Sequence, residues 1–404
     1  MVALTNIVFS KTTPQAPRRH KTFLSFDHHL FNASFPLPHI LNLFKRLTSF
    51  PKIHQRSLQI RNPFKDPLFS IPRSIDSKIF LLSFSLITRS ASRNESPETK
   101  GNVVEVYLRY MPERRHSVAA ITDDQVRKLE ILANTIRQDI LTMLTTAKSG
   151  HSAGPLGMAD IFTALYFHIL QHNPKRPNWT DRDRLFLSNG HIVPVRYAAM
   201  ARAGYFPLSE LSTLRQFGSR LQGHPELRFL PGLENTSGPL GDGSSQAVGA
   251  AYAARMNHET WHTYCVMSDG ELECGITWEA ALFAAKYQLN NLTWIIDRNN
   301  IQIDGYTEDV MPLEPLHEKF TAFGWNVLEI DGHNMRDIIN ACDRAESTWE
   351  APTIVIAHTI PGKGVSFMEC EPSWHGRPPK DRSELGTALK ELRTLGGKIN
   401  NNDL

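Results

Sequence analysis

Residues 263–305, TYCVMSDGELECGITWEAALFAAKYQLNNLTWIIDRNNIQIDG, decide the fold of this chain. Residues 263–267 and 292–296 are short runs of strand-forming residues, and residues 276–288 between them have a helical pattern. Each run is followed by an acid and then by small or amide residues. This order predicts a βαβ unit, in which a helix joins two parallel strands.

The two acidic turns of this unit are expected to lie at one edge of the sheet. Ligands of open parallel sheets bind beyond the carboxyl ends of the strands, so Asp269 is expected to face the turn 297–300. A carboxylate oxygen, an amide oxygen and a backbone carbonyl suit a hard divalent cation that also holds phosphate oxygens. The stretch therefore predicts a metal-diphosphate cofactor. Two solvated turns are the alternative, because Asp-Gly and Asn-Asn are common turn dipeptides.

The charge of the chain is divided unevenly along its length. Residues 1–100 hold fifteen Lys or Arg and five Asp or Glu, a balance of +10, and the remainder holds 29 against 36, a balance of −7. The basic charge belongs to a flank and shows no aromatic interleaving on a folded motif, so it is no evidence for nucleic acid binding. The four cysteines lie in the later part without CxxC spacing, which favours reduced thiols. No apolar run approaches the ~20 residues of a membrane-spanning helix.

The chain divides into three parts by composition. Residues 1–116 are rich in Arg and Ser and poor in acids, which is typical of a transit peptide, with a disordered leader or a translated upstream stretch as the alternative. A capping box of Thr122 and Gln125 predicts the first helix of an ordered domain that spans 117–393. A polar tail, 394–404, follows.

Strand-like and helical runs alternate through the ordered domain. Strands are expected at 184–187, 263–267, 292–296, 325–330 and 353–357, with helices at 245–256, 276–288 and 335–346 among others. This alternation predicts an α/β fold, a doubly wound and mostly parallel sheet with helices on both faces.

Four histidines stand in separate glycine-flanked turns: His151, His191, His224 and His375. Any one of them alone is more often a satisfied loop residue than a catalyst. No two have the close spacing of a zinc site, and no cysteine accompanies them. Together they suit binding of phosphate oxygens and proton transfer near neutral pH.

Several motifs of the chain resemble those of transketolase, in particular its separately encoded amino-terminal subunit. The Asp269-Gly270 pair and Asn299, thirty positions later, match the thiamine diphosphate fingerprint, and DRNNIQIDG, PGKGVSFME and WHG resemble transketolase wording. The resemblance implies a thiamine diphosphate-binding fold and a magnesium ion, or calcium or manganese in its place. Asp269, Asn299 and the carbonyl of Ile301 would be the metal ligands.

The same resemblance implies roles for the other motifs. Catalytic roles would fall to His151, His224 and His375. Cofactor contacts would be made by His191, Gly238, Leu240, Asp269, Gly270, Asn299 and His375.

Two positions depart from the family pattern. Ser268 stands where the family usually has glycine, and a positive φ there would strain the loop by about 1–2 kcal/mol. Cys274 stands where the family commonly has an acid at a subunit contact, which puts communication across that interface in question.

The resemblance implies a transferase of carbohydrate metabolism and the pentose phosphate pathway, which moves a ketol group between sugar phosphates. The glutamate that activates the cofactor in transketolases lies in a second domain, so a separate carboxy-terminal partner is expected, in a hetero-oligomer with two copies of each subunit. No membrane or nucleic acid partner is expected.

Two alternatives stay open at this point. One is another thiamine diphosphate enzyme, such as 1-deoxyxylulose 5-phosphate synthase or a 2-oxo acid dehydrogenase component, and the other is a non-catalytic regulatory subunit. The expected location is the cytoplasm, or a plastid or mitochondrion if the leader is a transit peptide.

Overall fold

The predicted βαβ unit forms the middle of the sheet. In the computed structural model, strand β2 (Thr263–Ser268) and strand β3 (Leu292–Arg298) pair in parallel, and helix α9 (Gly275–Lys286) joins them. The structure describes residues 121–401, with side chains described as far as residue 395. The expected leader, 1–116, therefore lies outside the described residues.

The main sheet has five parallel strands in the order β1-β2-β3-β7-β6. Its other strands are β1 (Arg184–Leu187), β6 (Asn326–Asp331) and β7 (Thr353–His358). A separate antiparallel pair, β4 (Ile301–Gln302) and β5 (Gly305–Tyr306), follows β3. The predicted parallel α/β sheet is confirmed.

Side chains alternate along each strand, so each strand contributes residues to both faces of the sheet. An apolar core packs against each face. Tyr264 and Val266 of β2 belong to one apolar core, whereas Cys265 and Met267 belong to the other.

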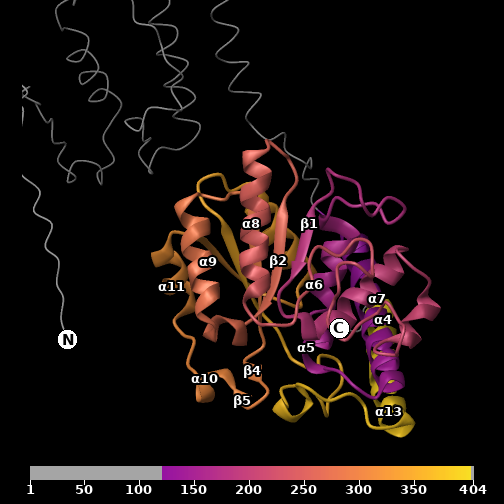
Figure 1. The fold of residues 1–404 in the computed structure, drawn as a ribbon. Coiled ribbons are helices and arrows are strands. Elements are labelled where there is room, and N and C mark those ends of the chain that lie inside the picture. The colour runs from indigo at the N-terminus through magenta and orange to yellow at the C-terminus, as the bar shows by residue number, and fades with distance from the viewer. Residues whose placement is uncertain (1–120, 402–404) are drawn as a thin grey trace, which may run out of the picture. The chain divides into compact units, whose positions relative to one another are not determined.

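Helices cover the two faces in separate groups (Figure 1). The first core contains side chains of α4 (Asp123–Ala147), α6 (Ala159–Ala164), α7 (Val193–Ala203) and α12 (Met335–Glu346). The second contains side chains of α8 (Asp242–Met256), α9 and α11 (Leu316–Phe323). The sheet is therefore doubly wound, as the alternation of elements predicts.

Helix α4 begins at the predicted cap. Thr122 Oγ1 accepts a hydrogen bond from the Gln125 backbone N–H, and the Gln125 side chain accepts one from the Thr122 N–H. The last helix, α13 (Arg382–Asn401), packs on α4, where Asn134 Nδ2 donates to the carbonyl of Leu392 at 2.8 Å.

Short helical segments lie in the connections between the main elements. The glycine-rich stretch after α4 is predicted to be a turn that leads into a helix through Asp160, but part of that stretch is itself the short helix α5 (Ala153–Gly157), which precedes α6. The others are η3 (Leu165–Ile169), η4 (Gly190–Ile192), η5 (Leu208–Thr213), η6 (Gly270–Glu273), α10 (Thr307–Val310) and η7 (Pro372–Trp374).

All four cysteines are free thiols, as their spacing predicts. Across residues 121–401, no helix is both long enough and apolar enough to pass through a bilayer.

Candidate functional site

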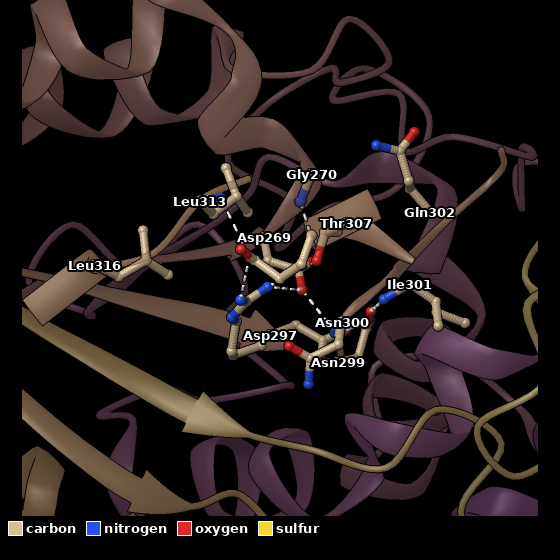
Figure 2. Close-up of polar contacts among 12 residues, drawn as sticks. Asp269, Gly270, Asp297, Asn299, Asn300, Ile301, Gln302, Thr307, Leu313 and Leu316 are labelled. Carbon is tan, nitrogen blue, oxygen red and sulfur yellow. Dashed lines mark hydrogen bonds and ion pairs between the residues drawn. The ribbon is translucent and has the colours of Figure 1, made fainter. Parts of the chain in front are cut away.

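The acidic turns that follow β2 and β3 meet at the carboxyl edge of the sheet, as the βαβ unit predicts. The Asp269 backbone N–H donates to the carbonyl of Asp297 at 3.2 Å, and Asp269 Oδ2 accepts the Asn300 N–H at 2.7 Å. Asp269 Oδ1 accepts the N–H of Gly270 at 2.8 Å. Figure 2 shows these side chains grouped around the Asp269 carboxylate. Two backbone N–H groups thus hold the buried carboxylate, and a third backbone contact joins the two turns.

Asp269 is fully buried and pairs with a buried arginine. Arg298 Nη1 lies 3.2 Å from Asp269 Oδ2, and Arg298 Nη2 lies 2.7 Å from Glu308 and 2.9 Å from Glu314. Burial raises the pKa of Asp269 to about 6, although the Asn300 N–H and the Arg298 charge oppose this rise. The residues after β3 thus hold the carboxylate in one orientation.

Asn299 is oriented by a carboxylate that the sequence motif does not assign. Asn299 Nδ2 donates to Asp297 Oδ2 at 2.8 Å, and Asn299 Oδ1 accepts the Ile301 N–H at 3.0 Å. Thr359 Oγ1 donates to the other oxygen of Asp297. Burial, together with the nearby Asp269 charge, raises the pKa of Asp297 to about 7. In the sequence, the only sign that Asp297 orients Asn299 is its position in the turn 297–300.

These residues fit a hard divalent cation by their chemistry. Among the described residues, no group of three His, Cys, Asp or Glu side chains could hold a metal ion. The carboxylate of Asp269, the amide of Asn299 and the carbonyl of Ile301 instead offer one oxygen each. Magnesium accepts such a mixed oxygen set and leaves further positions to phosphate or water.

Three of the four histidines come together in the folded chain. The ring centroids of His151 and His191 lie 4.8 Å apart, and each lies 5.6 Å from that of His375. The site for a Cβ on Gly190 is 3.2 Å from His224 Cδ2, so His224 lies against the same turn. Only His191 directly follows a strand, because His151 comes after α4 and the other two stand in longer loops.

All four histidines favour the neutral form. Burial lowers the pKa of His151 to about 4, with further lowering by His375, Arg215 and His224. Burial and the neighbouring histidines also lower the pKa of His191 well below its ordinary value. The pKa values of His224 and His375 are lowered by burial as well. At neutral pH these rings are therefore uncharged, and each can accept a hydrogen bond through its unprotonated nitrogen.

Buried polar atoms without a protein partner line this cluster. They are Nδ1 of His151 and of His375, both amide atoms of Asn189 and Oγ of Ser237. A Cβ on Gly190 would clash with Ser237 Oγ, so the Asn189 turn and the Ser237 loop are in contact. Buried polar groups require hydrogen-bond partners, so these atoms indicate a polar ligand. The sequence motifs assign no role to Asn189 and Ser237, although both residues belong to glycine-containing turns.

Gly238 and Leu240 lie in the loop that leads into α8. Nothing lies within 4 Å of the Cβ site on Gly238, and Leu240 is 38% exposed. Gly241 then adopts a φ of +86° before the helix starts at Asp242, three residues earlier than the sequence predicts.

The two departures from the family pattern have structural outcomes. Ser268 is the last residue of β2 and is not among the residues with positive φ, so the expected strain is absent. Cys274 is half-buried and precedes α9.

A protein-family model described as "Transketolase, thiamine diphosphate binding domain" matches residues 129–392. The chain belongs to the transketolase family. This finding confirms the resemblance of the motifs and assigns thiamine diphosphate as the cofactor of the domain.

Two relatives that are named as transketolase subunits match over nearly their whole length. A 6-deoxy-6-sulfo-D-fructose transketolase subunit from Clostridium sp. is 43% identical, and the match covers 61% of this chain and 90% of the relative. An apulose-4-phosphate transketolase subunit from Phocaeicola vulgatus is 42% identical, with 66% and 95% covered.

Single-chain transketolases match only in part. The solved transketolase from Campylobacter jejuni is 33% identical with a TM-score of 0.59, and the match covers 68% of this chain and 48% of that one. A solved transketolase variant from Pichia stipitis is also 33% identical, with a TM-score of 0.62. That match covers 67% of this chain and 41% of the Pichia stipitis chain. The chain therefore corresponds to an amino-terminal transketolase subunit.

Proposed function

We propose that this chain is the cofactor-binding half of a two-subunit transketolase, which transfers a two-carbon ketol group from a ketose phosphate to an aldose phosphate. The observation that carries the proposal is the meeting of Asp269 with the Asn299 turn at the carboxyl edge, near three clustered histidine rings. The Cβ site on Gly376 links the two groups, because it is 3.6 Å from His151 Nε2 and 4.0 Å from Ile303 Cγ1, in the turn that follows Asn299. This arrangement offers oxygen ligands for a cation next to neutral proton acceptors.

The residues present divide into two roles. Asp269, Asn299 and the Ile301 carbonyl would hold a divalent cation, and His191 would contact the diphosphate. When bound, thiamine diphosphate supplies the carbanion-stabilising chemistry of ketol transfer. His151 and His375, each with an unpartnered buried Nδ1, would orient sugar hydroxyls or accept a proton from them, with His224 beside them. Because their pKa values are lowered, these rings are neutral at pH 7 and can accept hydrogen bonds from sugar hydroxyls.

A second polypeptide completes the proposed enzyme. The two relatives that match over nearly their whole length carry names of transketolase subunits, and the chain spans 41% of the length of a single-chain transketolase from Escherichia coli. We therefore infer a partner that carries the pyrimidine-binding domain, in an oligomer with two copies of each subunit. A place in the pentose phosphate pathway follows from the sugar phosphate substrates.

The first test measures cofactor binding. Calorimetric titration of the full chain with thiamine diphosphate and Mg²⁺ is expected to show one site per chain, and Asp269→Asn should weaken it at least tenfold because a cation ligand loses its charge. Asp304→Asn, an exposed carboxylate of the β4–β5 turn, is the matched control and should bind normally. Equal affinity in the two variants would mean that the site is misplaced.

The second test measures turnover. The chain alone is expected to be inactive with ketose and aldose phosphates, whereas addition of a separately expressed pyrimidine-domain subunit should produce ketol transfer. Full activity of the isolated chain would contradict the need for a partner. Cofactor binding without turnover, with the partner present, would favour a regulatory subunit.

A further inference from the structure

Glu271 is a fully buried carboxylate two residues beyond Asp269, and no motif in the sequence assigns it a role. It belongs to the short segment η6 (Gly270–Glu273) that follows β2. Its side chain makes no ion pair among the described residues, so its charge is balanced by hydrogen-bond donors alone. A buried carboxylate of this kind is costly unless each oxygen has good partners.

The partners of Glu271 come from three different segments. Its Oε1 accepts the Ser188 hydroxyl at 2.5 Å and the Gly241 N–H at 2.7 Å, and its Oε2 accepts the Ser268 N–H at 2.9 Å. Ser188 directly follows strand β1 and precedes the His191 turn, and Gly241 ends the loop of Gly238 and Leu240. One carboxylate thus joins three segments that adjoin residues of the proposed cofactor site, namely His191, Asp269 and the pair Gly238 and Leu240.

The backbone around these contacts leaves little room for another arrangement. The Cβ site on Gly243 is 2.5 Å from Ser188 Cα, so the start of α8 lies directly against the end of β1. The Cβ site on Gly241 is 2.6 Å from Ile276 Cγ2 of α9. These segments are therefore packed in direct contact around the Glu271 carboxylate.

We propose that Glu271 is a positioning residue that sets the relative placement of the His191 turn, Asp269 and the 236–241 loop, and thereby the affinity for thiamine diphosphate. The proposal rests on the proposed function for its ligand. Its structural part, the joining of three segments, holds for the protein without ligand as well.

The choice of substitution follows from the number of acceptors. Glutamine has the shape of glutamate but replaces one acceptor oxygen with an NH₂ group. In Glu271→Gln this group must face the N–H of either Gly241 or Ser268, so one backbone contact is lost whichever way the amide turns. Glu273→Gln is the matched control, because Glu273 is exposed and bonds only the side chain of Gln302.

The first measurement is hydrogen exchange of the full chain without cofactor. Glu271→Gln should speed exchange of the Gly241 and Ser268 amides at least tenfold, whereas Glu273→Gln should leave both unchanged. Unaltered exchange in Glu271→Gln would overturn the proposal. If that variant does not fold, Ser188→Ala, which removes a single contact, should raise exchange around residues 188–192, and its failure to do so would overturn the proposal equally.

The second measurement is calorimetric titration with thiamine diphosphate and Mg²⁺. Second-layer partners of a site typically change affinity 10- to 100-fold, and a weakening in that range is expected for Glu271→Gln. Normal affinity with faster exchange would contradict the effect on the cofactor. If the unmodified chain binds no thiamine diphosphate, the proposed function fails, while the exchange result still decides whether Glu271 joins the three segments.

Discussion

At the scale of single residues, the neutral rings of His151, His191 and His375 make the stability of the fold sensitive to acid. Rings within 5.6 Å of each other in a buried cluster repel a shared gain of charge, and Arg215 adds a further positive charge beside His151. The unfolded chain has no such penalty, so protonation favours unfolding.

Replacement of His151 by asparagine should reduce the acid sensitivity of the protein without cofactor. The pKa of His151 is lowered to about 4 in the folded state, from 6.5, so its contribution to stability is full above pH 6.5 and is lost as the pH falls toward 4. Between pH 7 and pH 4.5, the unmodified chain should lose about 2 kcal/mol more unfolding free energy than His151→Asn. Urea denaturation at the two pH values measures this difference.

The other titrating groups of the site are present in both the unmodified chain and His151→Asn. Their contributions to the unfolding free energy therefore largely cancel when the two proteins are compared. Asp269 and Asp297, whose pKa values are raised, shift stability in the opposite direction over this range. Equal loss of stability in the two proteins would show that His151 is not the group that resists protonation.

At the scale of elements, the start of α8 shows how close packing creates a site. Gly243 lies against the backbone of Ser188, whereas Gly249, further along the same helix, has nothing within 4 Å of its Cβ site. Gly243 is therefore needed for the close contact between α8 and Ser188, whereas Gly249 has no such packing role.

Alanine at these two glycines should change stability in opposite directions. Gly243→Ala places a methyl group 2.5 Å from Ser188 Cα and should lower the unfolding free energy by about 1–3 kcal/mol. Gly249→Ala should raise it by up to about 1 kcal/mol, because alanine favours the helix and loses less entropy. Chemical denaturation of both variants provides the test, and destabilisation by Gly249→Ala would contradict the assigned packing.

At the scale of the whole molecule, the sheet lies between two apolar cores, and each core is completed by helices. Ile296 of β3 is fully buried in the core under α8, α9 and α11, whereas Leu282 on α9 is 54% exposed. Ile296 thus lies inside the layered fold, whereas Leu282 lies on its outer surface.

Truncation of these two residues should differ in cost. Ile296→Ala is expected to destabilise the protein by about 2–5 kcal/mol through lost burial and a residual cavity. Leu282→Ala should stay within about 0.5 kcal/mol. Thermal and urea unfolding measure both, and similar losses would mean that the outer face of α9 is covered by another protein surface in solution.

Much of the fold could be predicted from the sequence, because strand and helix periodicity is local. The helix Met335–Glu346 has the predicted bounds, and β7 extends only one residue beyond them. The short helix Ala153–Gly157 lies in a stretch that its glycines predict to be a turn. The Cβ site on Gly157 is 3.0 Å from the carbonyl oxygen of Ile360, a tertiary contact that the local sequence does not show.

By itself, the sequence determined the parallel α/β order, the family and the facing of Asp269 with the turn after β3, because these follow from local patterns and from the rule for strand ends. The tertiary structure alone decided that His151, His191 and His375 share one cluster and that Glu271 joins three segments. The physical reason is distance along the chain. Contacts between positions tens to hundreds of residues apart exist only after the sheet and both helical layers have closed around them.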